Sequence, residues 1–361
     1  QASSKIDYTY WRFDLLLQDS LLKGCVTQHF KVDNPINLFV LQASNKTLNI
    51  DSAIFHGQSQ SFSHIKDTLA IQLSENPELT NTDSITIYYT AKATTNFQDP
   101  FVIAEHNNKP LYWTLSQPLG AKNWWPTHEP LDDKADSVSF KVEVPKGLTA
   151  SSNGLLIKRK ELDSTTVFSF KHKYPIPAYL IAFAVGPYQI QEQQIKMPYG
   201  KLKIENYILE NELSKFRADA TVGFKSFNWF DTLLNFPYPY RKEKYGHTQM
   251  LRGGGMEHST NSFMGNFDFP LYVHELAHQW FGNYITCSSW KHIWLNEGIA
   301  TFFQGLLFER FYDGELWMQW KDVTRKSVLR KPNGSLIVQD SLNPSRIFDT
   351  RLSYHKGSFV L

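Results

Sequence analysis

The sequence predicts an α+β chain of two domains, with an antiparallel β domain over residues 1–205 and a mainly helical domain over residues 206–361. Three observations lead to this prediction. The chain has 361 residues, which suits two domains that each bury a core. Runs of alternating apolar and polar residues fill about the first 200 positions, and apolar residues at helical spacing follow. With 42% hydrophobic and 20% charged residues, the composition is that of a folded globular protein.

Short strands and turns alternate in the first domain. Residues 86–89, 139–144 and 167–170 alternate between apolar and polar side chains, as half-buried strands do. Residues that favour tight turns separate such runs. These turn residues stand at positions 33–35, 107–108, 145–147 and 152–154. Many short strands without a long helix indicate an antiparallel β domain.

Helical periodicity opens the second domain. Apolar residues at helical spacing predict a helix over residues 214–234. They are Phe216, Ala220, Phe224, Phe227 and Leu234. Two prolines, Pro237 and Pro239, end this helix, and three consecutive glycines at 253–255 follow before the next helices begin.

A histidine pair stands in the next predicted helix. His274 and His278 enclose Glu275 in a segment without Gly or Pro until Gly282, so we expect it to be helical. Residues four apart project from one face of a helix, and both imidazoles can therefore bind one metal ion. A catalytic zinc takes three protein ligands and leaves its fourth position to water. The alternative is that both histidines are ordinary helix residues and Glu275 is a surface charge.

Glu297 is the expected third ligand. It lies near the start of a second helical run over residues 294–309, and the segment after His278 is long enough for the loop between two ligand helices. Ligation by two histidines and a glutamate suits one zinc ion per chain, acting as a Lewis acid that lowers the pKa of its water to about 7. Glu275, close to that water, is the expected general base.

Further motifs accompany the histidine pair. Residues 278–283 read His-Gln-Trp-Phe-Gly-Asn, Glu297 stands in Trp-Leu-Asn-Glu-Gly, and residues 254–258 read Gly-Gly-Met-Glu-His. The other motifs are Tyr-Leu-Ile-Ala-Phe-Ala-Val-Gly at 179–186, Tyr-His-Lys-Gly at 354–357, and Ser-Gln at 116–117 ahead of Trp-Pro at 125–126. In these motifs the sequence resembles the aminopeptidase N family of zinc metallopeptidases (gluzincins), which includes the leukotriene hydrolases. It looks like a bacterial-type member.

The resemblance implies a fold and a reaction. It implies a saddle-like β domain, a thermolysin-like catalytic domain, and hydrolysis of the N-terminal peptide bond of peptides with a free N-terminus. Glu257 would hold the terminal ammonium by charge-assisted hydrogen bonds. By the same resemblance Gln117 would be a second anchor, and Tyr354 would donate a hydrogen bond to the developing oxyanion.

The neighbours of Glu257 complete the expected substrate site. Gly254 and Gly255 would let a substrate backbone approach closely and pair with the strand, and Met256 and His258 flank Glu257 in the same motif. The family has Asn where this chain has His258, whose side chain is bulkier and can titrate. His258 either alters substrate positioning or only shapes the loop.

Both ends of the chain carry expectations. Leu361 follows shortly after Tyr354, so the family's remaining helical part is expected to be absent and the catalytic domain to be truncated on its C-terminal side. Gln1 fits a processed start. A periplasmic or extracellular location is slightly favoured over the cytoplasm, although a start chosen for other reasons explains Gln1 equally well.

The charge, the apolar stretches and the cysteine count of the chain exclude several classes of protein. The net charge is +2 with Lys and Arg scattered, so no nucleic-acid partner is expected. The longest apolar stretch, residues 179–186, is far shorter than the roughly 20 residues of a membrane-spanning helix. Two cysteines, Cys25 and Cys287, exclude a disulfide scaffold. The sequence leaves the oligomeric state open.

Three other interpretations of the motifs remain. The chain could be a non-catalytic binding module on the same fold. It could be an epoxide or dual-function hydrolase, because the leukotriene hydrolases use the same zinc centre. It could also be an endopeptidase, although an endopeptidase has no need for the Gly-Gly-Met-Glu anchor.

Overall fold

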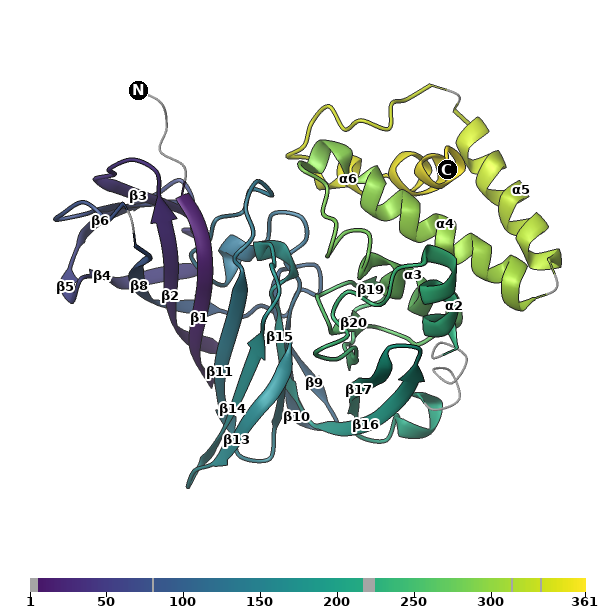
Figure 1. The fold of residues 1–361 in the computed structure, drawn as a ribbon. Helices are drawn as coiled ribbons and strands as arrows, with labels where there is room; N and C mark the ends of the chain where they lie inside the picture. The colour runs from purple at the N-terminus through teal and green to yellow at the C-terminus, as the bar shows by residue number, and fades with distance from the viewer. Residues whose placement is uncertain (1–5, 80, 217–224, 313, 332) are drawn as a thin grey trace. The chain divides into compact units, whose positions relative to one another are not determined.

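The chain divides into two units, Gln1–Ile190 and Gln191–Leu361 (Figure 1). The computed structural model describes residues 6–79, 81–216, 225–312, 314–331 and 333–361. The first unit is built mainly from strands, and the second carries the α-helices. The predicted α+β class, with β structure first and a helical region after it, is confirmed.

The described residues of the first unit form three sheets. Its strands are β1 (Ile6–Gln18), β2 (Leu21–Val32), β3 (Leu38–Gln42), β4 (Leu48–Phe55), β5 (Gln58–Ser59), β6 (Ser61–Ile65), β7 (Thr68–Gln72), β8 (Asp83–Lys92), β9 (Phe101–His106), β10 (Lys109–Thr114), β11 (Ser137–Pro145), β12 (Thr149–Ser152), β13 (Leu155–Glu161), β14 (Thr165–His172) and β15 (Phe183–Gly186). An eight-stranded sheet has the order β13-β14-β11-β1-β2-β8-β4-β5. The smaller sheets are β12-β15-β10-β9 and β3-β7-β6, and two short 3-10 turns are η1 (Ala121–Asn123) and η2 (Ala178–Leu180).

Alternating burial along β1 builds part of the core of the large sheet. Trp11 and Phe13 are both buried. The ring centroid of Phe13 lies 5.0 Å from that of Phe140 on β11 and 4.9 Å from that of Trp125. Aromatic pairs at such distances stabilise a core beyond the area that they bury. The alternating pattern of the sequence is thus the pattern of one buried and one exposed sheet face.

One strand pair differs from the prediction. β1 pairs with β11 in parallel, whereas β2, β14 and β8 join the same sheet in antiparallel pairs, so the large sheet is mixed. Side-chain alternation has a period of two in both kinds of pair. The sequence pattern alone therefore did not distinguish them.

The second unit combines a sheet with helices. Its strands are β16 (Tyr188–Met197), which begins just before the unit, β17 (Gly200–Leu209), β18 (His247–Gln249), β19 (Gly255–Met256) and β20 (Ser262–Met264), in the order β16-β17-β18-β20-β19. Its helices are α2 (Ser226–Leu234), α3 (Phe269–His278), α4 (Trp294–Phe311), α5 (Glu315–Leu329), α6 (Pro344–Ile347) and α7 (Gly357–Phe359). A 3-10 turn, η3 (Trp290–His292), and a π-helical turn, η4 (Thr350–Lys356), complete it.

The division at Ile190 falls before the predicted boundary at residue 205. The reason is that β17 pairs in parallel with β18, through Tyr207 and Thr248, and so belongs to the sheet of the second unit. The sequence boundary was set by the first helical periodicity, which begins only after this strand.

The helix predicted over residues 214–234 is described in part. α2 covers Ser226–Leu234, and Asn235 ends it in the left-handed conformation, with φ of 47°, ahead of Pro237. Ala220 and Phe224, which also supported the prediction, lie outside the described residues.

Two predictions from composition can be checked in the described part of the chain. No helix there is both long and apolar enough to cross a membrane. Cys25 and Cys287 are free cysteines, as expected without a disulfide scaffold.

Candidate metal centre

The histidine pair lies at the C-terminal end of α3. Asp268 caps this helix, because its side chain accepts a hydrogen bond from the backbone N–H of Leu271, and Pro270 occupies the first turn. His274 and His278 therefore stand one turn apart on one face. Their Nε2 atoms are 3.1 Å apart. The predicted helix thus brings both imidazoles to one point.

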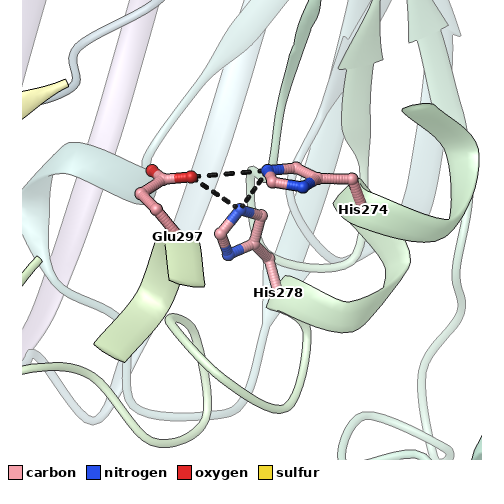
Figure 2. Close-up of side chains that lie close together, drawn as sticks. All are labelled: His274, His278 and Glu297. Carbon is pink, nitrogen blue, oxygen red and sulfur yellow. Dashed lines mark hydrogen bonds and ion pairs between the residues drawn. The ribbon is translucent and has the colours of Figure 1, made fainter. Parts of the chain in front are cut away.

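Glu297 meets them from the first turn of α4. Its Oε2 atom lies 3.4 Å from Nε2 of His274 and 3.4 Å from Nε2 of His278 (Figure 2). The Nδ1–H of His278 donates to the carbonyl oxygen of Phe281 at 3.1 Å, which leaves its Nε2 to face the glutamate. The structure therefore brings the three predicted ligands together with their donor atoms converging.

The charges of the cluster favour a cation. Burial raises the pKa of Glu297, but the neighbouring charge of His278 and hydrogen bonds from both histidines lower it to about 2. Burial lowers the pKa of His278, but the nearby carboxylates of Glu257 and Glu297 raise it to about 10. The carboxylates of Glu257 and Glu297 thus stabilise a positive charge on the imidazole of His278. A divalent cation would supply the same charge in place of a proton.

Glu275 lies against the backbone of Gly255. A Cβ atom on Gly255 would stand only 2.6 Å from the carboxyl carbon of Glu275, so a side chain at this position would displace the carboxylate. Glu275 is buried, and its Oε2 atom has no hydrogen-bond partner among the described residues. Burial raises the pKa of Glu275 well above its usual range. A buried carboxyl group with a raised pKa is typical of catalytic sites.

Glu257 faces the same point from another element. Its carboxylate, that of Glu275 and a ring nitrogen of His278 all lie within 4.8 Å of one another. Glu257 follows β19 directly and is 2% exposed. Two carboxylates of different origin therefore stand beside the histidine–glutamate cluster.

The other residues of the Gly-Gly-Met-Glu-His motif have different surroundings. Gly254 adopts φ of +84°, a conformation that suits glycine, and Gly255 pairs with Met264 of β20. The side chains of Met256 and His258 are both buried. Their expected contacts with a substrate stay predictions.

His258 is a packed side chain. Its ring lies edge-on to Phe263, with 4.4 Å between centroids, and neither ring nitrogen has a hydrogen-bond partner among the described residues. Burial lowers the pKa of His258 to about 3. Titration near neutral pH, which its residue type suggested, is therefore not expected in this environment.

Tyr354 reaches the cluster from η4. Its ring stacks on His274, with 6.1 Å between centroids and 17° between planes. Burial raises the pKa of Tyr354 well above its usual range, so that the phenol keeps its proton and can donate it in a hydrogen bond. Such π-helical turns are frequent at functional sites.

Two glycines, Gly298 and Gly357, allow the segment that carries Tyr354 to lie close to Glu297. A Cβ on Gly298, the residue after Glu297, would lie 2.7 Å from the carbonyl carbon of Gly357. The backbones of α4 and α7 are therefore in direct contact. Gly298 and Gly357 each stand in a motif, but only the structure shows that they meet.

Gln117 lies in the first unit. It is half-buried in the turn that follows β10. The metal cluster belongs to the second unit, and the role of Gln117 as a second anchor stays a prediction.

Two models of one protein family match the chain. The peptidase M1 N-terminal domain matches residues 5–180, and the peptidase family M1 domain matches residues 268–361. Together they cover well over half of the sequence.

Two aminopeptidases of plants match part of the chain. Aminopeptidase M1-D of Oryza sativa subsp. japonica is 28% identical over 255 residues, which are 64% of this chain and 29% of the relative. Aminopeptidase M1 of Arabidopsis thaliana is 27% identical over 283 residues, 71% of this chain and 31% of the relative. The chain thus spans about a third of the length of these relatives.

Solved structures share the fold. A crystal structure of a mutant M1 zinc metallopeptidase from Deinococcus radiodurans has a TM-score of 0.78 at 20% identity and covers 98% of this chain and 81% of its own. The same mutant enzyme bound to a Tyr-Ser-Ala substrate gives a TM-score of 0.78 at 21% identity, with the same coverage. At this identity the likeness concerns the fold.

Proposed function

The chain belongs to peptidase family M1, and from this membership and the geometry of its site we propose that it is a zinc-dependent aminopeptidase. The proposed substrates are peptides with a free N-terminus, from which the enzyme removes one residue at a time. The two plant relatives, both named as aminopeptidases, support this proposal.

One observation supports the exopeptidase reaction above the others. Glu257 and Glu275 lie with His278 inside one 4.8 Å cluster, so an anchor for an ammonium group and a candidate base flank the same metal ligand. A substrate whose terminal amine binds Glu257 then places its first peptide bond next to Glu275. Cleavage after the first residue follows from this short spacing.

The residues present fit a zinc ion. His274, His278 and Glu297 offer two ring nitrogens and one carboxylate oxygen, the donor set of several catalytic zinc sites, and their donor atoms converge. Zinc held by these residues would polarise the scissile carbonyl and lower the pKa of a water molecule to about 7.

The side chains of the chain divide the remaining work. Glu275, as a carboxylate, accepts the proton of the attacking water and passes it to the leaving amine. The phenol of Tyr354, kept protonated by burial, donates a hydrogen bond to the oxyanion that develops. Glu257 holds the substrate ammonium, and Gln117 is proposed as the second anchor.

A comparison of three substrates tests this proposal against its rivals. We expect the longest purified form of the protein to hydrolyse leucine p-nitroanilide but neither an N-acetylated peptide nor a lipid epoxide. Cleavage of the acetylated peptide would indicate an endopeptidase, and turnover of the epoxide would indicate an epoxide hydrolase. Zinc binding without turnover of any of the three would favour a binding module.

The remaining expectations stand as proposals. No nucleic-acid partner is proposed, because the net charge is only +2 and Lys and Arg are scattered. A periplasmic or extracellular location would suit an enzyme that degrades peptides.

A further inference from the structure

The loop that carries Glu257 belongs to the second unit and is buried. It connects β19 to β20, which pair antiparallel through Gly255 with Met264 and Met256 with Phe263. All five loop residues, 257–261, are buried. A loop without exposed backbone needs internal hydrogen-bond partners, because buried carbonyl and N–H groups are seldom left unpaired.

The side chain of Gln279 supplies three of these partners. Gln279 follows the proposed ligand His278 directly and is fully buried. Its Nε2 donates to the carbonyl oxygen of Glu257 at 3.2 Å and to that of His258 at 3.4 Å. Its Oε1 accepts from the backbone N–H of Thr260 at 2.9 Å. One amide thus bridges both sides of the turn.

Asn283 adds a second donor to the same carbonyl. Its Nδ2 lies 2.6 Å from the carbonyl oxygen of Glu257, and its side chain is fully buried. The backbone N–H of Asn283 donates to the carbonyl oxygen of His278 at 3.0 Å, so that this side chain is tied to the end of the ligand helix. Two amides therefore converge on the backbone oxygen of the residue proposed to bind the substrate amine.

The turn itself is held in an uncommon conformation. Thr260 has φ of 65°, in the left-handed region that β-branched residues rarely adopt. Such a conformation persists only where the surrounding structure fixes it. The hydrogen bond from Thr260 to Gln279 is one contact that fixes it.

We propose that Gln279 and Asn283 are positioning residues that hold Glu257 at a set distance from the His274–His278 helix. They act through the backbone of Glu257 and touch neither substrate nor metal. Because Gln279 is the neighbour of His278 in the chain, the place of the amine anchor is fixed by the same helix end that places a metal ligand. This inference rests on the proposed function, because a fixed position of Glu257 matters for activity only if Glu257 binds the substrate amine.

The test compares two inhibitors on the zinc-loaded protein by titration calorimetry. Leucine hydroxamate carries an amine, and 4-methylpentanoic hydroxamate is the same molecule without it. The ratio of their dissociation constants reports the amine anchor alone, because both bind the metal through the hydroxamate. We expect Gln279→Met and Asn283→Ala to reduce the wild-type ratio about tenfold, as the loss of hydrogen bonds to a buried carbonyl can do. Zinc content should stay unchanged.

A matched control separates positioning from general damage. Gln28 is also fully buried, and its Nε2 donates to the carbonyl oxygen of Pro126 at 2.9 Å in the first unit. Gln28→Met should lower the melting temperature to a similar degree and keep the wild-type ratio. If Gln279 and Asn283 only stabilised the fold, their variants would likewise keep the wild-type ratio of the two dissociation constants.

Each outcome decides the inference. If Gln279→Met and Asn283→Ala keep the wild-type ratio, or weaken both hydroxamates equally, the inference is wrong. If Gln279→Met does not fold, Asn283→Ala decides alone. If the wild-type protein binds zinc but shows no preference for the amine-bearing hydroxamate, the proposed aminopeptidase function fails first, and the inference fails with it.

Discussion

Glu275 is placed at a position that stability alone does not favour. One of its oxygen atoms is buried without a hydrogen-bond partner among the described residues, and an unpaired buried acceptor costs about 1–3 kcal/mol. Its carboxylate also requires a glycine at position 255. Such a group is typical of a site retained for chemistry.

Replacing this carboxylate should separate chemistry from metal binding. We expect Glu275→Gln to reduce turnover of leucine p-nitroanilide by about 10²–10⁴-fold, because the amide cannot accept the proton of water. Zinc per chain, measured by atomic absorption, should not change. Glu129→Gln, at another buried glutamate but in the first unit, should leave turnover within about twofold on the same scale. Wild-type turnover in Glu275→Gln would refute the assignment of the base.

The glycine beneath Glu275 offers a second test in the same loop. The Cβ of Gly255→Ala would stand 2.6 Å from the carboxyl carbon, so the carboxylate must move, and we expect kcat to fall by about 10²-fold or more. Gly253→Ala is the control, because a Cβ there meets nothing within 4 Å. Equal kcat values for both variants would show that the contact between Gly255 and Glu275 is unimportant.

Single residues also show where the sequence stops being informative. The spacing of His274 and His278 predicted their convergence, because helix geometry fixes it. The environment of His258 was not predictable, since its burial against Phe263 depends on the pairing of β19 with β20, which are too short to show alternation in the sequence. Gln279 and Asn283 stand in the His-Gln-Trp-Phe-Gly-Asn motif, but no rule of spacing indicates which backbone groups their side-chain amides contact.

Between elements, the contact of α4 with α7 places Tyr354 next to the ligand cluster. Gly298→Ala inserts a Cβ 2.7 Å from the backbone of Gly357. We expect it to lower the free energy of unfolding by about 1–3 kcal/mol and to reduce kcat at least tenfold, because the oxyanion donor shifts. Gly305→Ala, two turns further along α4, would meet the ring of Trp320 at 2.7 Å. It should lower stability comparably and keep kcat, and the same loss of kcat in both would contradict the account.

An ion pair connects β17 to the segment before β18. Glu205 and Lys244 are fully buried, with Oε1 and Nζ 2.8 Å apart, and Lys203 bonds the other carboxylate oxygen at 2.6 Å. Burial raises the pKa of Glu205, but the two lysines lower it to about 2, below its ordinary value of 4.5. A carboxyl group whose pKa is lower in the folded protein than in the unfolded protein stabilises the fold at a pH above its unfolded pKa. This stabilisation is lost as the pH falls through its folded pKa.

Acid unfolding checks this pair. We expect the free energy of unfolding of the wild type to fall by about 3 kcal/mol between about pH 5 and pH 2 because of Glu205 alone. Glu205→Gln should be less stable at pH 7, since Lys244 loses its buried partner, and should show a correspondingly smaller loss in acid. Urea titrations at pH 7, 5, 3 and 2 measure both. Parallel pH profiles for the two proteins would contradict the depressed pKa.

Helices and strands were predictable where residue spacing within the element itself shows a helical or strand period. α3 and the start of α4 follow from local spacing and from Pro and Gly punctuation. The parallel pairing of β1 with β11 and the inclusion of β17 in the second sheet depend on partners more than 30 residues away. Alternation records only which face of a strand is buried, so neither pairing could be deduced.

The whole molecule divides its chemistry unevenly. The three proposed metal ligands belong to the second unit. Glu257, Glu275 and Tyr354 belong to it as well, whereas Gln117 belongs to the first. The family models match both units, and the chain spans about a third of the plant relatives. Activity therefore has to be measured on the longest form of the protein that can be purified.

Zinc-dependent hydrolysis of leucine p-nitroanilide tests the central claim most directly. The metal content is determined first, the rate is then measured before and after a chelator, and zinc is finally restored. The account predicts about one zinc per chain, as in single-metal catalytic sites, with activity that the chelator removes and zinc returns. A protein that binds no zinc, or that cleaves the substrate equally well after the metal has been removed, would contradict it.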